Sequence, residues 1–200
     1  MKHQQRKKAY VARNTQSNKN EISEIICQQL INFSYFKNAS TIMCYLHCRS
    51  EVRTLEFVKA QLKHKKRIII PYCTKDKNGE NKLGLWHLED LNELVAGTWG
   101  ILEPPKTRWN DKSKNITAEE LDLIIVPAVA FSRKGARLGN GAGYYDRLLN
   151  QVRNDCDLIG VGYESQLFED IEMNEHDVYM DFVLTEKQLY KTGVRHYSSV

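Results

Sequence analysis

The segment from Ile124 to Val152 decides the fold, and it reads Ile124-Ile-Val-Pro-Ala-Val-Ala-Phe-Ser-Arg-Lys-Gly-Ala-Arg-Leu-Gly-Asn-Gly-Ala-Gly-Tyr-Tyr-Asp-Arg-Leu-Leu-Asn-Gln-Val152. Its apolar start predicts a buried strand over 124–129, and apolar residues at helical spacing predict a helix from 144 to 152. Between them, Gly139, Gly141 and Gly143 allow unusual backbone angles and let main-chain N–H groups approach a ligand. A glycine-rich turn that leads from a strand into a helix is typical of phosphate binding.

Cations crowd this turn, because Lys134, Arg137 and Arg147 all lie within it or beside it. Like charges repel one another unless an anion neutralises them, so their presence favours a phosphate ligand over a turn that serves packing alone. The glycine spacing matches neither the standard NTPase loop nor the dinucleotide-binding motif. We therefore expect a phosphate site of another kind.

The rest of the chain alternates predicted strands and helices around this segment. Helices are predicted over 2–13, 20–33 and 53–63, and strands over 41–46, 67–71, 83–88, 121–127, 157–163 and 181–184. This order predicts an α/β fold, a single three-layer domain over residues 1–200 with a mostly parallel sheet. In such sheets ligands bind at the carboxyl ends of the strands, so the loops after Leu46, Ile70 and Val126 are expected to share one edge. The polar segment 98–115 is expected to be a surface loop.

Composition narrows the functional class. The chain has 200 residues, 42% of them hydrophobic, and lacks an apolar run long enough to cross a membrane. A basic start without an apolar core, together with five scattered cysteines, predicts a cytoplasmic protein with reduced thiols. The net charge of +4 is too small to indicate a nucleic-acid protein and suits a small anionic ligand.

The glycine turn also carries a family signature. The matching residues, all in register, are Pro127, Phe131, Gly135, Arg137, Leu138, Gly139, Gly141, Gly143, Tyr144, Tyr145 and Asp146. On these residues the chain resembles the 5-formyltetrahydrofolate cyclo-ligases, also called methenyltetrahydrofolate synthetases. Further similar segments lie at 2–6, 45–52, 98–104 and 174–185, so the resemblance spans almost the whole chain. Ser132 and Ala142 depart from it, since the family usually has aspartate at the first position and glycine or lysine at the second.

The resemblance implies an enzyme with a Rossmann-like (NagB/RpiA/CoA-transferase-like) fold. It implies that ATP and Mg²⁺ are required to close 5-formyltetrahydrofolate, with or without a polyglutamate tail, to 5,10-methenyltetrahydrofolate. The γ-phosphoryl group would pass to the formyl oxygen, N10 would attack the activated carbon, and phosphate would leave. We expect a monomer that binds neither nucleic acid nor membrane.

The resemblance also implies roles for individual residues. Those expected to bind the nucleotide are Lys2, Arg6, Lys134, Gly135, Arg137, Leu138, Gly139, Asn140, Gly141, Ala142, Gly143 and Tyr145. Those expected to bind the folate are Leu46, Cys48, Glu51, Trp99 and Tyr144. The expected magnesium carboxylates are Asp146 and Asp177, and the expected catalytic residues are Arg137, Tyr144 and Tyr145.

Several alternatives stay open at this level. The chain fits a sugar-phosphate isomerase that binds phosphate without ATP, an RNA-binding module that uses residues 133–147, or a divergent relative that binds folate without turnover. Lys2 and Arg6 fit disordered terminal charges. Glu51 fits a cap for the helix that follows it, and Tyr144 and Tyr145 fit packing aromatics.

Overall fold

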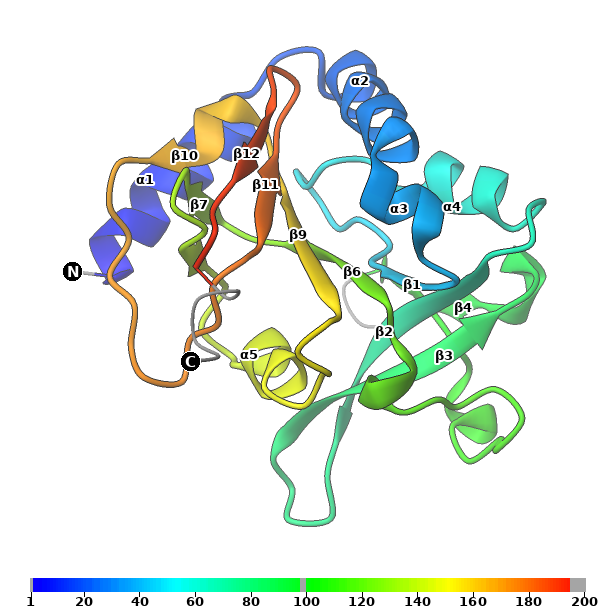
Figure 1. Ribbon diagram of the computed structural model, residues 1–200. Helices are drawn as coiled ribbons and strands as arrows, with labels where there is room; N and C mark the ends of the chain where they lie inside the picture. The colour runs from blue at the N-terminus through cyan, green and yellow to red at the C-terminus, as the bar shows by residue number, and fades with distance from the viewer. Residues whose placement is uncertain (1, 98–99, 195–200) are drawn as a thin grey trace.

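The core of the protein is a seven-stranded sheet, seen in a computed structural model that describes residues 2–97 and 100–194 (Figure 1). The strand order is β12-β11-β9-β6-β1-β2-β3. The strands are β1 (Thr41–Cys44), β2 (Arg67–Lys75), β3 (Asn81–Leu88), β6 (Leu123–Pro127), β9 (Asp157–Val161), β11 (Phe182–Leu184) and β12 (Leu189–Lys191). The five strands from β2 to β11 are parallel, and the edge strands β3 and β12 are antiparallel to their neighbours. The mostly parallel sheet is thus confirmed.

Helices cover both faces of this sheet, which explains why its central strands are apolar throughout. On one face lie α2 (Lys19–Asn32), α3 (Ser34–Asn38) and α4 (Leu55–Gln61), and on the other lies α5 (Tyr144–Leu149) (Figure 1). Neighbouring residues of β2 point in opposite directions: Ile68 packs into the core beneath α2–α4, and Ile69 packs into the core beneath α5. The predicted helices and strands are confirmed, with ends that shift by a few residues. The exception is β2, which continues to Lys75, so the loop expected after Ile70 does not occur there.

The chain between β6 and the glycine turn differs from the prediction. A continuous strand over 124–129 was expected, but β6 ends at Pro127 and a short hairpin follows, made of β7 (Ala130–Ser132) and β8 (Arg137–Leu138). The buried Ser132 Oγ accepts the N–H groups of Lys134 (3.3 Å) and Ala136 (3.1 Å), which fixes the hairpin turn. This hairpin and β10 (Leu167–Phe168) form a second, three-stranded sheet.

The segment expected to be a surface loop contains regular secondary structure. It contains β5 (Leu102–Glu103), which pairs with β4 (Val95–Ala96), and the 3₁₀ helix η3 (Lys106–Arg108). Trp109 packs against Tyr72 of β2, with ring centres 5.0 Å apart. Burial of such a large aromatic ring holds the segment on the sheet. Further 3₁₀ helices among the described residues are η1 (Leu91–Glu93), η4 (Ala118–Glu120) and η5 (Glu164–Gln166).

The first helix, α1 (Lys2–Thr15), packs outside the two main layers, beside the small sheet (Figure 1). Its Ala9 joins a minor core with Val129, Leu138 and Ile171. Among the described residues, no helix combines the length and apolar character needed to cross a membrane. The position of α1 brings the N-terminal end of the chain to the glycine turn.

Candidate active site

A cleft of about 600 Å³ opens where α1, the glycine turn, α5 and the loop before β11 meet. Nine of the residues predicted to bind nucleotide or metal line it: Lys2, Arg6, Arg137, Leu138, Gly139, Gly141, Gly143, Asp146 and Asp177. Its other lining residues are Arg147, Asn150, Gln151, Asn174 and His176. Segments from both ends of the chain thus converge on one charged cavity.

The glycines of the turn make room for arginine side chains. Gly141 has φ 97° and Gly143 has φ 71°, both in the left-handed region that favours glycine. A Cβ atom on Gly143 would lie 2.8 Å from Arg147 Nη1, and one on Gly139 would lie 3.0 Å from Arg137 Nη1. The turn therefore has guanidinium groups packed directly against its backbone, an arrangement suited to an anion.

Arg137 lies at the base of the cleft with its side chain only 3% exposed. Its Nη2 pairs with Asp146 Oδ1, and its guanidinium carbon lies 5.7 Å from the centre of the Tyr145 ring. Its buried Nε has no hydrogen-bond partner among the described residues. A buried donor without a partner is costly, so this cation is suited to a ligand that accepts hydrogen bonds.

Helix α1 supplies two further cations to the cleft. Lys2 Nζ lies 2.5 Å from Asp177 Oδ2, and Arg6 Nε donates to the Gly139 carbonyl oxygen at 2.9 Å. Burial tends to raise the pKa of Asp177, but hydrogen bonds from Lys2 and from the Asn174 N–H outweigh it and lower that pKa below its ordinary value. Because Lys2 and Arg6 lie in an ordered helix with these contacts, the interpretation of both as disordered terminal charges is wrong.

The composition of the cleft fits a magnesium triphosphate. Lys2, Arg6, Arg137 and Arg147 would neutralise phosphate oxygens, and Asp146 and Asp177 are the hard oxygen ligands that Mg²⁺ prefers. No group of three metal-binding side chains occurs in residues 2–97 and 100–194. A magnesium ion here would therefore depend on phosphate and water for its remaining ligands, as is usual for this ion.

A second set of predicted residues lies around Glu51. Its Oε2 accepts the Cys48 N–H at 2.8 Å, and its Oε1 lies 3.7 Å from Nη1 of the buried Arg13. Burial raises the pKa of Glu51 above its ordinary value, although the Cys48 N–H and the charge of Arg13 oppose this shift. Helix α4 begins later, with Thr54 as its N-cap, so the interpretation of Glu51 as a helix cap is wrong.

The two tyrosines follow the glycine turn on α5. Both are half-buried and pack against the core beneath α5. Burial raises the pKa of Tyr145, and the charge of the nearby Glu51 raises it further. Burial also raises the pKa of Tyr144, and the neighbouring Cys73 adds to this shift. Tyr145 thus lies near both Arg137 of the cationic cleft and the predicted folate-binding carboxylate.

Comparison with known proteins decides the family. The family model for the 5-formyltetrahydrofolate cyclo-ligase family matches residues 1–186. The chain belongs to this family. It is 34% identical over 148 residues to a 5-formyltetrahydrofolate cyclo-ligase from Mycolicibacterium smegmatis, with 74% of each chain covered. It is 30% identical to the mitochondrial enzyme of the same name from Arabidopsis thaliana, covering 81% of this chain and 65% of that one.

The solved structure of a relative shares the fold. The NMR structure of a 5,10-methenyltetrahydrofolate synthetase from Aquifex aeolicus superposes with a TM-score of 0.80 at 30% identity. The match covers 96% of this chain and 92% of the other. The mixed α/β architecture with its large, mostly parallel sheet is therefore that of a cyclo-ligase.

Not every residue predicted from the cyclo-ligase resemblance lines the cleft. Lys134 is exposed, with Nζ 3.5 Å from Asp170, and Gly135 sits in the β7–β8 turn with φ 87°. Asn140 accepts a hydrogen bond from Tyr10, and the Ala142 carbonyl accepts one from Arg147 at 3.1 Å. The nucleotide roles of these four residues, like those of the other residues predicted to bind nucleotide, remain predictions.

The folate-binding predictions differ in how far the structure describes them. Leu46 is 8% exposed and belongs to the core beneath α2–α4, and Cys48 lies beside Glu51. Trp99 lies outside the described residues. Sequence reasoning missed Asn150, whose Nδ2 donates to the carbonyls of Asp146 (2.8 Å) and His176 (3.1 Å) and so joins two walls of the cleft. Asparagine at the end of a helix gives no sequence signal for such a contact.

The two departures from the cyclo-ligase signature have local explanations. Ser132 caps the β7–β8 turn from a buried position and does not line the cleft. Replacement of the family's usual aspartate by this serine therefore removes no charge from the cleft lining. Ala142 is exposed and interacts through its carbonyl.

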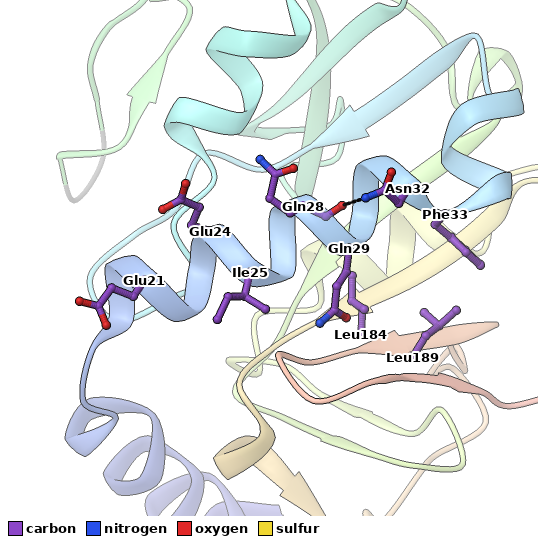
Figure 2. A pocket seen from close by; sticks show the side chains of 9 residues that line it. All are labelled: Glu21, Glu24, Ile25, Gln28, Gln29, Asn32, Phe33, Leu184 and Leu189. Atoms are coloured by element: carbon purple, nitrogen blue, oxygen red, sulfur yellow. Dashed lines mark hydrogen bonds between the residues drawn. The ribbon is translucent and has the colours of Figure 1, made fainter.

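A second hollow, of about 750 Å³, lies between α2 and the β11–β12 edge (Figure 2). None of the predicted site residues line it.

Proposed function

We propose that this protein is a 5-formyltetrahydrofolate cyclo-ligase that converts 5-formyltetrahydrofolate to 5,10-methenyltetrahydrofolate, with ATP converted to ADP and phosphate. The observation that carries the proposal is the family match over residues 1–186, together with a cationic glycine cleft whose Arg137 lies over the Tyr145 ring. The family match favours this function over the sugar-phosphate isomerase and RNA-binding alternatives.

The formyl oxygen is a poor leaving group, and ATP would supply the phosphoryl group that makes it a good one. In phosphoryl transfer a protein mainly aligns the reactants and neutralises charge. Lys2 and Arg6 on α1 would hold the outer phosphates, with the amides of residues 139–143 opposite them. Arg137, fixed by Asp146, would stabilise the charge that develops on the transferred group.

The carboxylates of the cleft would bind the metal ion. Asp146 and Asp177 would hold Mg²⁺, directly or through water, and the ion would neutralise phosphate oxygens. Each carboxylate pairs with a cation of the protein, Arg137 for Asp146 and Lys2 for Asp177. Binding of magnesium and triphosphate together would exchange these pairs for new ones, with the cations turning to phosphate and the carboxylates to the metal.

The folate would bind on the side of the site that contains Tyr144 and Tyr145. Glu51 would accept hydrogen bonds from pterin N–H groups, since an ionised carboxylate only accepts. Leu46, Cys48 and Trp99 would flank the pterin, while Tyr144 and Tyr145 would lie beside N10. This arrangement would direct N10 toward the formyl carbon as phosphate leaves with the former formyl oxygen. Lys134, Gly135, Asn140 and Ala142 would complete the surroundings of the nucleotide.

We extend the proposal to the whole chain: one Rossmann-like domain of the NagB/RpiA/CoA-transferase type, acting as a cytoplasmic monomer without nucleic-acid or membrane partners.

The stoichiometry of the reaction tests the proposed function. Each molecule of methenyl product must appear with one ADP and one phosphate. Folate conversion without ADP, or ATP hydrolysis that does not depend on folate, would contradict it.

A further inference from the structure

One face of α1 contacts both halves of the proposed site. Lys2, Arg6, Tyr10 and Arg13 follow at intervals of four, four and three residues, so they project from the same side of the helix. The first two reach Asp177 and the Gly139 carbonyl, and Tyr10 donates to Asn140. Farther along, Arg13 reaches Glu51. A rigid helix that rises about 16 Å over these residues thus joins the nucleotide cleft to the folate side.

The side chain of the buried Arg13 contacts Glu51 and orients it. Arg13 is only 4% exposed; its Nε donates to Ser50 Oγ at 3.0 Å and its Nη1 to the Ala128 carbonyl at 3.1 Å. Among the described residues, Glu51 is the carboxylate that lies within ion-pair distance of it. A buried cation needs such a partner. With Cys48 N–H on one oxygen of Glu51 and Arg13 near the other, the carboxylate is fixed from two sides.

Few residues of α1 are buried against the rest of the protein, and its other contacts are mainly polar. Of its fourteen residues, only Ala9 and Arg13 are buried, and its first turn contains no acidic residue. Four cations, Lys2, Arg6, Lys7 and Lys8, lie in its first half. Elements with so few buried contacts open locally at small free-energy cost. A ligand that binds Lys2 and Arg6 only when α1 is docked therefore stabilises the docked helix.

We propose that Arg13 is a positioning residue for Glu51 and that nucleotide binding, by holding α1 in place, strengthens folate binding through Arg13. This inference rests on the proposed function, which supplies the two ligands. The contact path runs from Asn140 through Tyr10, whose ring centre lies 5.3 Å from the Arg13 guanidinium carbon, to Glu51. Since coupling is reciprocal, folate strengthens nucleotide binding by the same factor.

Calorimetry on the full chain tests this coupling. The dissociation constant of 5-formyltetrahydrofolate is measured with and without a saturating, non-hydrolysable ATP analogue and Mg²⁺. In the unmodified protein the analogue tightens folate binding by about fivefold or more. Arg13→Met resembles the aliphatic stem of the side chain and removes its charge. This variant weakens folate binding by about tenfold, binds the analogue alone within about twofold of normal, and reduces the coupling factor to about one.

The controls separate positioning from a general loss of structure. Lys8→Met removes a charge from an exposed position of the same helix and leaves the coupling intact. Arg13→Lys retains a charge without the planar fork of arginine, so its coupling is intermediate. If Arg13→Met fails to fold, Arg13→Lys carries the test, and full coupling in that variant overturns the inference. Equal weakening of both ligands by Arg13→Met overturns it too.

The outcome for the unmodified protein distinguishes the two proposals. If both ligands bind but neither affects the other, the coupling is refuted and the proposed function stands. If neither ligand binds, the proposed function is refuted, and the inference that depends on it is refuted as well.

Discussion

Arg137 and Asp146 form an ion pair at the base of the cleft, with the arginine side chain 3% exposed and the aspartate 24% exposed. The pair joins β8 to α5, and the arginine keeps one buried donor free of described partners. A nearly buried guanidinium with a spare donor is prepared for a phosphate without having to be desolvated first.

Replacement of this arginine is expected to abolish most turnover. Arg137→Met should lower kcat by about 10²–10³-fold, because stabilisation of the transferred phosphoryl charge is lost. Initial rates at saturating substrates measure this effect. Arg153→Met is the matched control: Arg153 pairs with Asp122 and Asp155 on the surface and does not line the cleft, so its kcat should remain near normal. Equal losses in the two variants would remove Arg137 from the mechanism.

The glycine turn allows a test in which backbone strain is held constant. Gly143→Ala and Gly79→Ala both place alanine at a positive φ, 71° and 81°, and each should lose roughly 1–2 kcal/mol of unfolding free energy. A Cβ atom at Gly79 meets no atom within 4 Å, whereas one at Gly143 crowds Arg147. Only Gly143→Ala should weaken nucleotide binding as well, measured by calorimetry. Normal nucleotide affinity in that variant would show that the turn does not contact the ligand.

Much of this architecture can be predicted from the sequence, because its central strands are uninterrupted apolar runs. Ile68, Ile69 and Ile70 are β-branched and are followed by Pro71, which favours a short buried strand. The β7–β8 hairpin could not be predicted, since its strands have three and two residues, too few for periodicity, and a serine hydroxyl makes its turn. Arg13 escaped notice for another reason: its contact with Glu51 spans 38 positions, and tertiary packing alone creates it.

The carboxylates of the cleft are expected to set the magnesium requirement. Asp146→Asn should raise the Mg²⁺ concentration needed for half-maximal activity by about tenfold or more, because an amide is a weaker ligand than a carboxylate for this ion. Asp170→Asn is the control, since Asp170 is exposed and lies outside the residues that line the cleft. An unchanged magnesium dependence in Asp146→Asn would assign the metal elsewhere.

The Lys2–Asp177 pair predicts a dependence of stability on pH. The folded-state pKa of Asp177 lies below its ordinary value of 3.8, so its contribution is present above pH 3.8 and disappears as the pH falls below it. Denaturant unfolding should show Asp177→Asn less stable than the unmodified protein by about 1 kcal/mol or less at neutral pH. The difference should shrink on acidification below 3.8. A constant difference would mean that the ion pair does not contribute.

Glu51 predicts a dependence of folate binding on pH. Its pKa is raised above 4.5, mainly by burial, and the ionised form accepts hydrogen bonds from the pterin. Folate affinity should therefore decrease on acidification at a pH above that of an ordinary glutamate. Arg13 lowers this pKa, so in Arg13→Met the decrease should move to higher pH. Calorimetric titrations at several pH values measure the shift, and a shift to lower pH would contradict the placement of Arg13.

The most direct test of the central claim is the near-ultraviolet absorbance of the methenyl product after the purified protein is mixed with 5-formyltetrahydrofolate, ATP and Mg²⁺. We predict a rise that requires all three components and is lost in Arg137→Met. No rise with the unmodified protein, while folate and ATP still bind, would contradict the assignment of cyclo-ligase activity.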